Sequence, residues 1–193
     1  MSLTNKELIH ELNQKVEDCI IRVNRLLTYE IEALNWREDN ASWNVLECIE
    51  HLNLYGDFYL PEIEKRISAS KRKVVGEQHR FKYSRWGNFF VNAVAPKEEG
   101  KINKMNAFKN LNPHFDKLEK NTLDKFLKQQ ERLLQLLEQA KDLDLNKIKT
   151  NSTIKFVRLR LGDTLRAEIY HNQRHINQAY KVIGNLGKAR TEA

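Results

Sequence analysis

Hydrophobic residues recur at steps of three and four positions in four long segments of the chain, which is the pattern of amphipathic helices. In the first segment, the repeat follows a Thr4-x-x-Glu7 capping box and continues to about Leu34. The apolar stripe consists of Leu8, Leu12, Val16, Ile20, Val23 and Leu27. The opposite face is charged, so we expect this helix to lie with one side on a core and the other in water.

A second helix is predicted from Asn44, where Asn44-x-x-Glu47 forms another capping box, to about Ile67. Pro61 removes one backbone donor, so it marks either a kink or the last turn of this helix. Two neighbouring stripes carry its apolar and aromatic residues: Val45, Ile49 and Leu52 on one, and Cys48, His51, Tyr55 and Phe58 on the other.

A third helix is expected over about residues 122–140, with Asn121-x-x-Asp124 as its candidate N-terminal cap. The connection before it, residues 68–115, contains five of the ten glycine and proline residues of the chain and is predicted to be irregular. A short helical piece is plausible within it, around residues 86–93. A connection of this length inside a compact domain more often has a function than serves only to join two helices.

The fourth helix is predicted from Asp163 to about Gly184 or Gly187, because glycine often follows the last helical residue. The connection before it, residues 141–161, contains a short apolar–polar alternation that is not enough to predict a sheet. Four amphipathic helices indicate an all-α fold with a four-helix bundle as the leading architecture. A length of 193 residues suits one domain, so we expect a single domain over residues 1–193.

Positive charge is concentrated in one connection of the chain. The net charge is +7, but residues 65–109 contain 12 basic and 3 acidic residues, a balance of +9, which leaves −2 for the remainder. We call residues 65–110 the basic crossover, between the second and third helices. Its interleaved aromatic residues allow three interpretations: a pocket wall that attracts an anionic cosubstrate, a single-stranded nucleic-acid surface, or a solvated crossover packed on the bundle. No nucleic-acid readout module is recognisable, which argues against the second.

Several classes of protein are disfavoured. No stretch approaches the roughly 18 consecutive apolar residues of a membrane span, and the first residues lack the layout of a secretory signal. Two cysteines, Cys19 and Cys48, cannot form a disulfide framework. We therefore expect a cytoplasmic protein with neither membrane nor nucleic acid as a partner.

Candidate chemistry lies in three of the histidines. His171 and His175 project from one face of the fourth helix, a spacing that suits two ligands of one metal ion but also fits two exposed imidazoles. His51 lies mid-helix beside apolar residues, where an unpartnered imidazole is costly to bury. A bundle can combine residues of facing helices into one core site. The three histidines are thus a candidate site for Zn²⁺, Ni²⁺ or Fe²⁺.

Three stretches of the sequence resemble a known family. Residues 43–52, Trp-Asn-Val-Leu-Glu-Cys-Ile-Glu-His-Leu, resemble the Trp-Ser-x-x-Glu-x-x-x-His-Leu signature of the DinB-like superfamily (DinB/YfiT-like metalloproteins). Residues 162–178 resemble its closing motif, His-x-x-Arg-His-x-x-Gln, and residues 104–113 resemble the loop before its third helix. The resemblance covers about residues 8–183. Asn44 stands where the family more often has Ser, which leaves helix capping intact.

The resemblance implies an up-down-down-up four-helix bundle with a long crossover, a divalent metal on His51, His171 and His175, and often a homodimer. Some relatives are metal-dependent thiol transferases or isomerases that use low-molecular-weight thiols such as bacillithiol or mycothiol; many others have no established activity. A metal-dependent enzyme that activates a thiol or water for group transfer or hydrolysis of a small-molecule substrate is therefore expected. Asn172 occupies the position of the general base in the His-Glu-x-x-His motif, so a zinc-protease mechanism lacks its base.

Further candidates surround the histidines, each with a structural alternative. Glu47, one turn before His51, either orients an imidazole or serves only in its capping box. Tyr55 and Gln178 either line the site or pack within the bundle, and Arg174 is expected at the surface. The alternative function is a non-catalytic binding or scaffold protein that acts through the basic crossover, with a structural or opportunistic metal.

Overall fold

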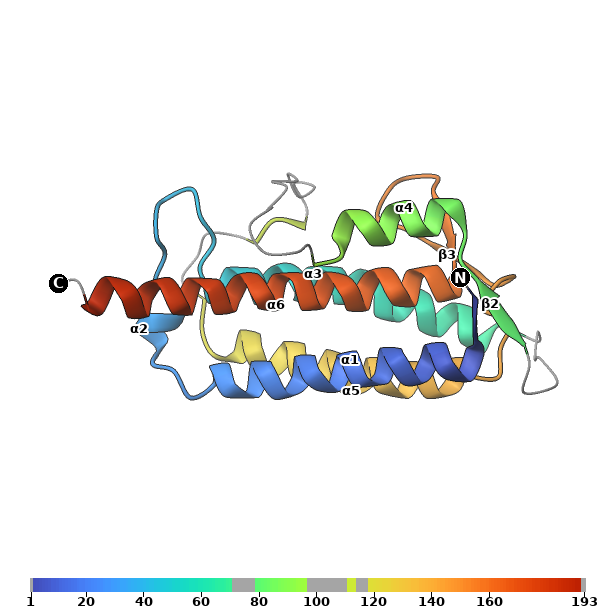
Figure 1. The fold of residues 1–193 in the computed structure, drawn as a ribbon, viewed down its shortest axis with the longest axis horizontal. Coiled ribbons are helices and arrows are strands. Elements are labelled where there is room, and N and C mark those ends of the chain that lie inside the picture. Colours follow the sequence, from blue (N-terminus) through green and yellow to red (C-terminus); the bar gives the residue numbers. More distant parts are fainter. Residues whose placement is uncertain (1, 71–78, 97–110, 114–117, 192–193) are drawn as a thin grey trace.

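The computed structural model describes residues 2–70, 79–96, 111–113 and 118–191 of the chain (Figure 1). The protein is mostly helical within these ranges, as predicted. Its helices are α1 (Asn5–Leu26), α2 (Ile31–Leu34), α3 (Val45–Ser68), α4 (Arg85–Val94), α5 (Asn121–Ala140) and α6 (Leu161–Thr191). Its strands are β1 (Ser2–Thr4), β2 (Arg80–Lys82), β3 (Lys149–Asn151) and β4 (Arg158–Arg160). Among the described residues, no helix is both long enough and apolar enough to cross a membrane.

The four long helices lie side by side, with α1 and α6 running in one direction and α3 and α5 in the other (Figure 1). Both α1 and α3 pack against α5 and α6, while the short α4 packs on α6. The apolar stripes of the long helices meet in two buried clusters. On α6, Ile169 belongs to one cluster and Ile176 to the other, so the stretch that contains His171 and His175 lies at the boundary between them.

The first helix is shorter than predicted. It begins at its Thr4–Glu7 capping box as expected, but it ends at Leu26 instead of near Leu34. The chain turns there, and the Thr28 hydroxyl donates to the Arg25 carbonyl. The separate helix α2 then buries Leu34, so the apolar residue keeps its place in the core after the main helix has ended.

The second helix agrees with its prediction, since Asn44 and Glu47 form the capping box and the helix continues to Ser68 with Pro61 inside it. The short helix expected around residues 86–93 is α4, whose N-terminus is capped by the Ser84 side chain. Within the basic crossover, residues 71–78 and 97–110 lie outside the described residues.

Predictions for the third and fourth helices need two corrections. The third helix covers the predicted residues, but its N-cap residue is Lys120, and no side chain caps that end. The fourth helix does not stop at a glycine, because Gly184 and Gly187 both lie inside α6. A β-carbon added at either glycine would meet no atom within 4 Å, so these positions face open space and require no terminating turn.

Two small antiparallel strand pairs were not predicted from the sequence. β1 pairs with β2, and β3 pairs with β4 in a hairpin before α6. Hydrogen bonds from the Leu161 amide to the Ile148 carbonyl and from the Gly162 amide to the Leu145 carbonyl fix this hairpin at the start of α6. Three-residue strands are too short to produce a readable period of two.

Candidate metal centre

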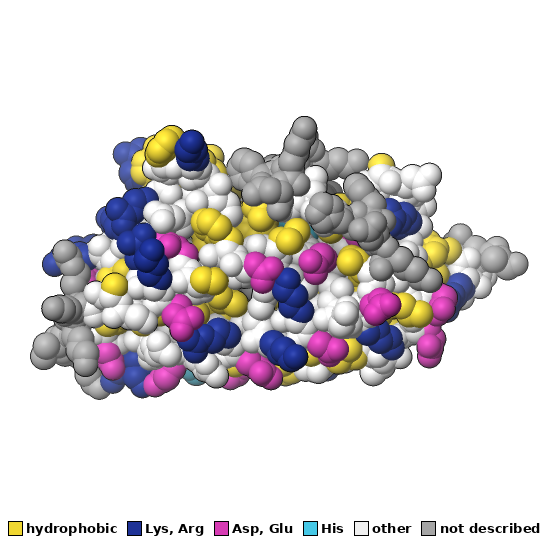
Figure 2. Space-filling view, turned by 180° about the vertical axis from the view of Figure 1, so that it is seen from behind, with side chains coloured by type: hydrophobic (Ala, Val, Ile, Leu, Met, Phe, Trp, Pro, Cys, Tyr) yellow, Lys and Arg dark blue, Asp and Glu magenta, His cyan; other side chains and the backbone are white. Residues whose placement is uncertain are grey.

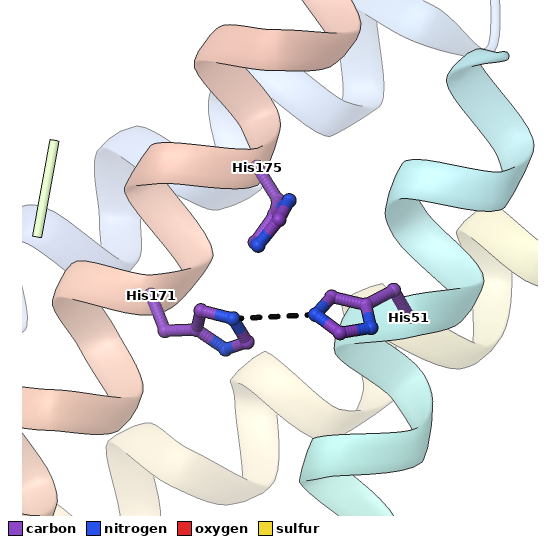
Figure 3. A group of neighbouring side chains, drawn as sticks. All are labelled: His51, His171 and His175. Atoms are coloured by element: carbon purple, nitrogen blue, oxygen red, sulfur yellow. Dashed lines mark hydrogen bonds between the residues drawn. The ribbon is translucent and has the colours of Figure 1, made fainter. Parts of the chain in front are cut away.

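Three buried histidines from two helices converge in the interior. His51 extends from α3, and His171 and His175 extend toward it from adjacent turns of α6 (Figure 3). One ring nitrogen of each residue lies within 4.8 Å of the corresponding nitrogens of the other two. The exposed fractions of the three residues are 3%, 5% and 7%, so they form an enclosed cluster.

Hydrogen bonds at the outer ring nitrogens determine which nitrogens face the centre. His51 Nδ1 lies 2.7 Å from the Leu111 carbonyl oxygen, which can only accept, so this nitrogen carries the proton. His175 Nδ1 lies 3.0 Å from the Gln178 side-chain oxygen and donates to it in the same way. In both neutral rings Nε2 therefore keeps its lone pair. Such partners of the second nitrogen are typical of metal-ligating histidines.

Burial keeps the three imidazoles uncharged at neutral pH. It lowers the pKa of His51 from 6.5 to about 4 and the pKa of His175 to about 3, and it lowers the pKa of His171 well below 6.5. The Arg174 guanidinium adds to this effect by repelling a second positive charge. A neutral imidazole is the form that binds a metal ion.

Aromatic rings enclose the cluster on two sides. The Trp43 ring centroid lies 4.8 Å from that of His51 and 5.8 Å from that of His175. The Tyr55 ring lies 4.9 Å from His51 and 4.4 Å from His171. Apolar walls of this kind limit the access of water and lower the local dielectric constant.

The structure brings together some of the residues predicted for the site and separates others. Tyr55 and Gln178 contact the histidines as described. Glu47 does not: its carboxylate accepts from the Asn44 amide at 2.8 Å and from the Arg37 guanidinium at 3.0 Å, so the capping role is the one observed. Arg174 is half-buried, and its guanidinium donates to the Ala93 carbonyl at the end of α4 at 2.8 Å.

Glu168 is a buried carboxyl group that was not predicted from the sequence as part of the site. It lies on α6 one turn before His171 and is 4% exposed. Its Oε2 has no hydrogen-bond partner within the described part of the chain. Burial raises the pKa of Glu168 to about 8, and the carboxyl is close enough to raise the pKa of the Tyr55 and Tyr59 hydroxyls. The sequence contained one indication that this carboxyl is buried, because Glu168 lies near the apolar Leu165 and Ile169 in the same helix.

Comparisons with known proteins identify the family. Neither the curated proteins nor the solved structures give a match. The model of the DinB superfamily matches residues 22–179, most of the chain and the part that contains all three histidines. The chain therefore belongs to the DinB superfamily.

Proposed function

We propose that the protein is a metal-dependent enzyme in which His51, His171 and His175 bind one divalent ion, Zn²⁺, Ni²⁺ or Fe²⁺. The four long helices then correspond to the up-down-down-up four-helix bundle of the family. One observation carries the proposal: three buried, neutral imidazoles present nitrogens within 4.8 Å of one another. Burying three polar rings together is costly unless their nitrogens have partners.

The spacing of the nitrogens suits a shared ion. His51 Nε2 and His171 Nε2 are 3.3 Å apart. Two nitrogens that each lie about 2.0–2.1 Å from a tetrahedral ion are about 3.3 Å from one another. Three protein ligands with a further open position is the arrangement of catalytic zinc sites, whereas structural sites are closed by four.

The chemistry that a bound ion supplies here is to lower the pKa of a thiol or water at its open position, so that the nucleophile forms near neutral pH. The residues of the chain support that chemistry. Trp43 and Tyr55 exclude water from the rings, and Gln178 and the Leu111 carbonyl orient two imidazoles. The Glu168 carboxyl holds a proton at neutral pH and is our candidate for proton delivery to a leaving group.

The reacting thiol is proposed to come from a small-molecule substrate. Cys19 and Cys48 are fully buried free thiols. Burial raises the pKa of Cys19 to about 12 and also raises the pKa of Cys48, so neither forms a thiolate readily. Group transfer to or from a low-molecular-weight thiol is the function that family membership and this site favour together. We propose further that the protein acts in the cytoplasm as a homodimer.

The test replaces one proposed ligand and follows both metal and activity. His171→Ala should remove the bound ion and any thiol-transferase activity, and a chelator should remove the same activity from the wild type. His10→Ala is the matched control, because His10 is exposed on α1 and lies outside the cluster. Unchanged metal stoichiometry in His171→Ala would show that the ligand assignment is wrong.

A second candidate function rests on the surface of α4, which lies within the basic crossover. Trp86 is 73% exposed and Phe89 is 65% exposed, and their rings lie 6.2 Å apart. A binding or scaffold protein could use such a surface. In that case chelation would leave partner binding intact, while reversing the charges of Lys71, Arg72 and Lys73 would abolish it.

A further inference from the structure

A groove lies apart from the histidines, between the C-terminal half of α3 and the β3–β4 hairpin. Its volume is about 660 Å³. Its walls include Phe58, Glu62 and Lys65 of α3 and Ile154, Lys155, Phe156 and Arg158 of the hairpin. Small-molecule sites typically have volumes of about 300–1,000 Å³, so the groove has the size of a ligand site.

The two walls are tied together by hydrogen bonds. The Asn151 amide donates to Glu62 Oε1 at 2.7 Å, and the Thr153 amide donates to the Tyr59 hydroxyl at 3.3 Å. Both bonds join the hairpin to α3. The groove is therefore preformed, which reduces the ordering cost of binding.

The groove exposes apolar surface that the fold does not cover. Phe58 and Ile154 are 38% and 37% exposed, and Phe156, in the hairpin loop, is 92% exposed. Phe156 also has a φ of 67°, in the left-handed region that aromatic residues rarely adopt. A large side chain held in an unfavourable conformation, with almost no burial in return, indicates a role outside the fold.

Positive charge borders this apolar surface. Lys65, Lys155 and Arg158 are exposed, and none forms an ion pair with another described residue. The single carboxylate of the groove, Glu62, is already engaged by Arg66 at 2.8 Å and by the Asn151 amide. Figure 2, which is turned by 180° from Figure 1, shows hydrophobic side chains next to Lys and Arg side chains toward the left. This end corresponds to the right end of Figure 1, where β3 lies.

We propose that this groove binds a free organic anion with an extended apolar body, of the fatty-carboxylate class. The apolar body lies against Phe58, Ile154 and Phe156, and the carboxylate is held by Lys65 and Arg158. A protein partner fits less well, because a stable protein interface involves about 20–30 residues on each side, whereas 11 residues line this groove. The groove site is separate from the three histidines and does not require the metal.

The experiment is calorimetric titration of the full chain with laurate below its micelle concentration. Dodecylamine, which has the same chain length and the opposite charge, serves as the ligand control. One laurate should bind per chain, and dodecylamine should bind at least about tenfold more weakly, because its ammonium meets three cations while the one carboxylate of the groove is already engaged. Adding a chelator should leave laurate binding unchanged.

Paired variants locate the site. Lys65→Glu/Arg158→Glu should weaken laurate binding about tenfold or more, whereas Lys128→Glu/Lys181→Glu, with the same change in net charge, should stay within about twofold. Phe156→Ser should weaken binding about fivefold, and Phe89→Ser, on the exposed face of α4, should not. Ile154→Ser provides a second apolar test if Phe156→Ser fails to fold.

Three results would overturn the proposal. They are equal binding of laurate and dodecylamine, equal loss in the two charge-reversal pairs, and no measurable laurate binding by the folded wild type. Light scattering supplies a fourth: if Phe156→Ser halves the molar mass in solution, a second copy of the chain covers this surface and the ligand assignment is wrong.

Discussion

Gln178→Leu removes a side-chain hydrogen bond that orients a proposed ligand and leaves all three imidazoles in place. The Gln178 oxygen accepts from His175 Nδ1 at 3.0 Å, which keeps the proton on Nδ1 and the lone pair on Nε2. The corresponding partner of His51 is the backbone carbonyl of Leu111, which no substitution deletes. Gln178 is therefore the position at which the orientation of a ligand can be tested by itself.

The size of the effect follows from the role of such partners. Loss of a hydrogen bond to the second nitrogen of a ligating histidine typically weakens metal binding 10- to 100-fold. That range corresponds to about 1.4–2.7 kcal/mol in binding free energy. Leucine has a similar volume and Gln178 is only partly buried, so we expect little change in the free energy of unfolding of the metal-free protein.

The assay is competition for Zn²⁺ with a chromophoric chelator of known affinity. Gln173→Leu, on the same helix and outside the hydrogen bonds of the three rings, is the matched control and should bind like the wild type. If Gln178→Leu binds zinc as tightly as Gln173→Leu does, then His175 is not oriented by this hydrogen bond and the description of the site is incorrect.

Three further predictions concern the stability of the metal-free protein. Folding lowers the pKa of the clustered histidines below 6.5, so the unfolded chain binds more protons than the folded chain does. The free energy of unfolding should therefore fall as the pH falls from about 6.5 to about 4. Urea titrations at several pH values measure this change. Burial raises the pKa of Glu168 from 4.5 to about 8, so the stability that its protonated form contributes is lost as the pH rises from 4.5 through 8. Glu168→Gln should therefore be more stable than the wild type by about 4 kcal/mol at pH 8 and nearly equal to it at pH 4.5. Gly87→Ala should destabilise by about 1–3 kcal/mol in thermal melts, because the new β-carbon would lie 1.9 Å from Asp163 Cγ, whereas Gly184→Ala should stabilise by about 0.5–1 kcal/mol.

The cluster was predictable from local signals in the sequence together with the resemblance to the DinB-like superfamily. His171 and His175 are one turn apart in a helix that periodicity identifies, and His51 lies on the buried side of another such helix. Antiparallel packing of long helices then brings the residues together. The bounds of α3 were predictable from its capping box and apolar stripe, and those of α5 from its apolar stripe alone, because its predicted cap is not formed.

Features that depend on distant contacts were not predictable. The β3–β4 hairpin is held by hydrogen bonds such as that between the Thr150 and Thr164 hydroxyls, whose oxygens are 2.5 Å apart. No local sequence pattern predicts such a bond. The role of the Leu111 carbonyl is invisible because a backbone acceptor has no residue signature. Glu168 was missed because a single glutamate in a helix is ordinarily exposed, and only the packing shows that this one is buried.

Metal content tests the three-histidine site most directly. The protein should be purified without a histidine-rich tag, and its metal should be quantified by elemental analysis beside the His51→Ala variant. The account predicts about one divalent ion per chain in the wild type and its loss in the variant. A wild type that carries no ion and takes up neither Zn²⁺ nor Ni²⁺ would contradict the account, and so would a His51→Ala variant that retains the metal in full.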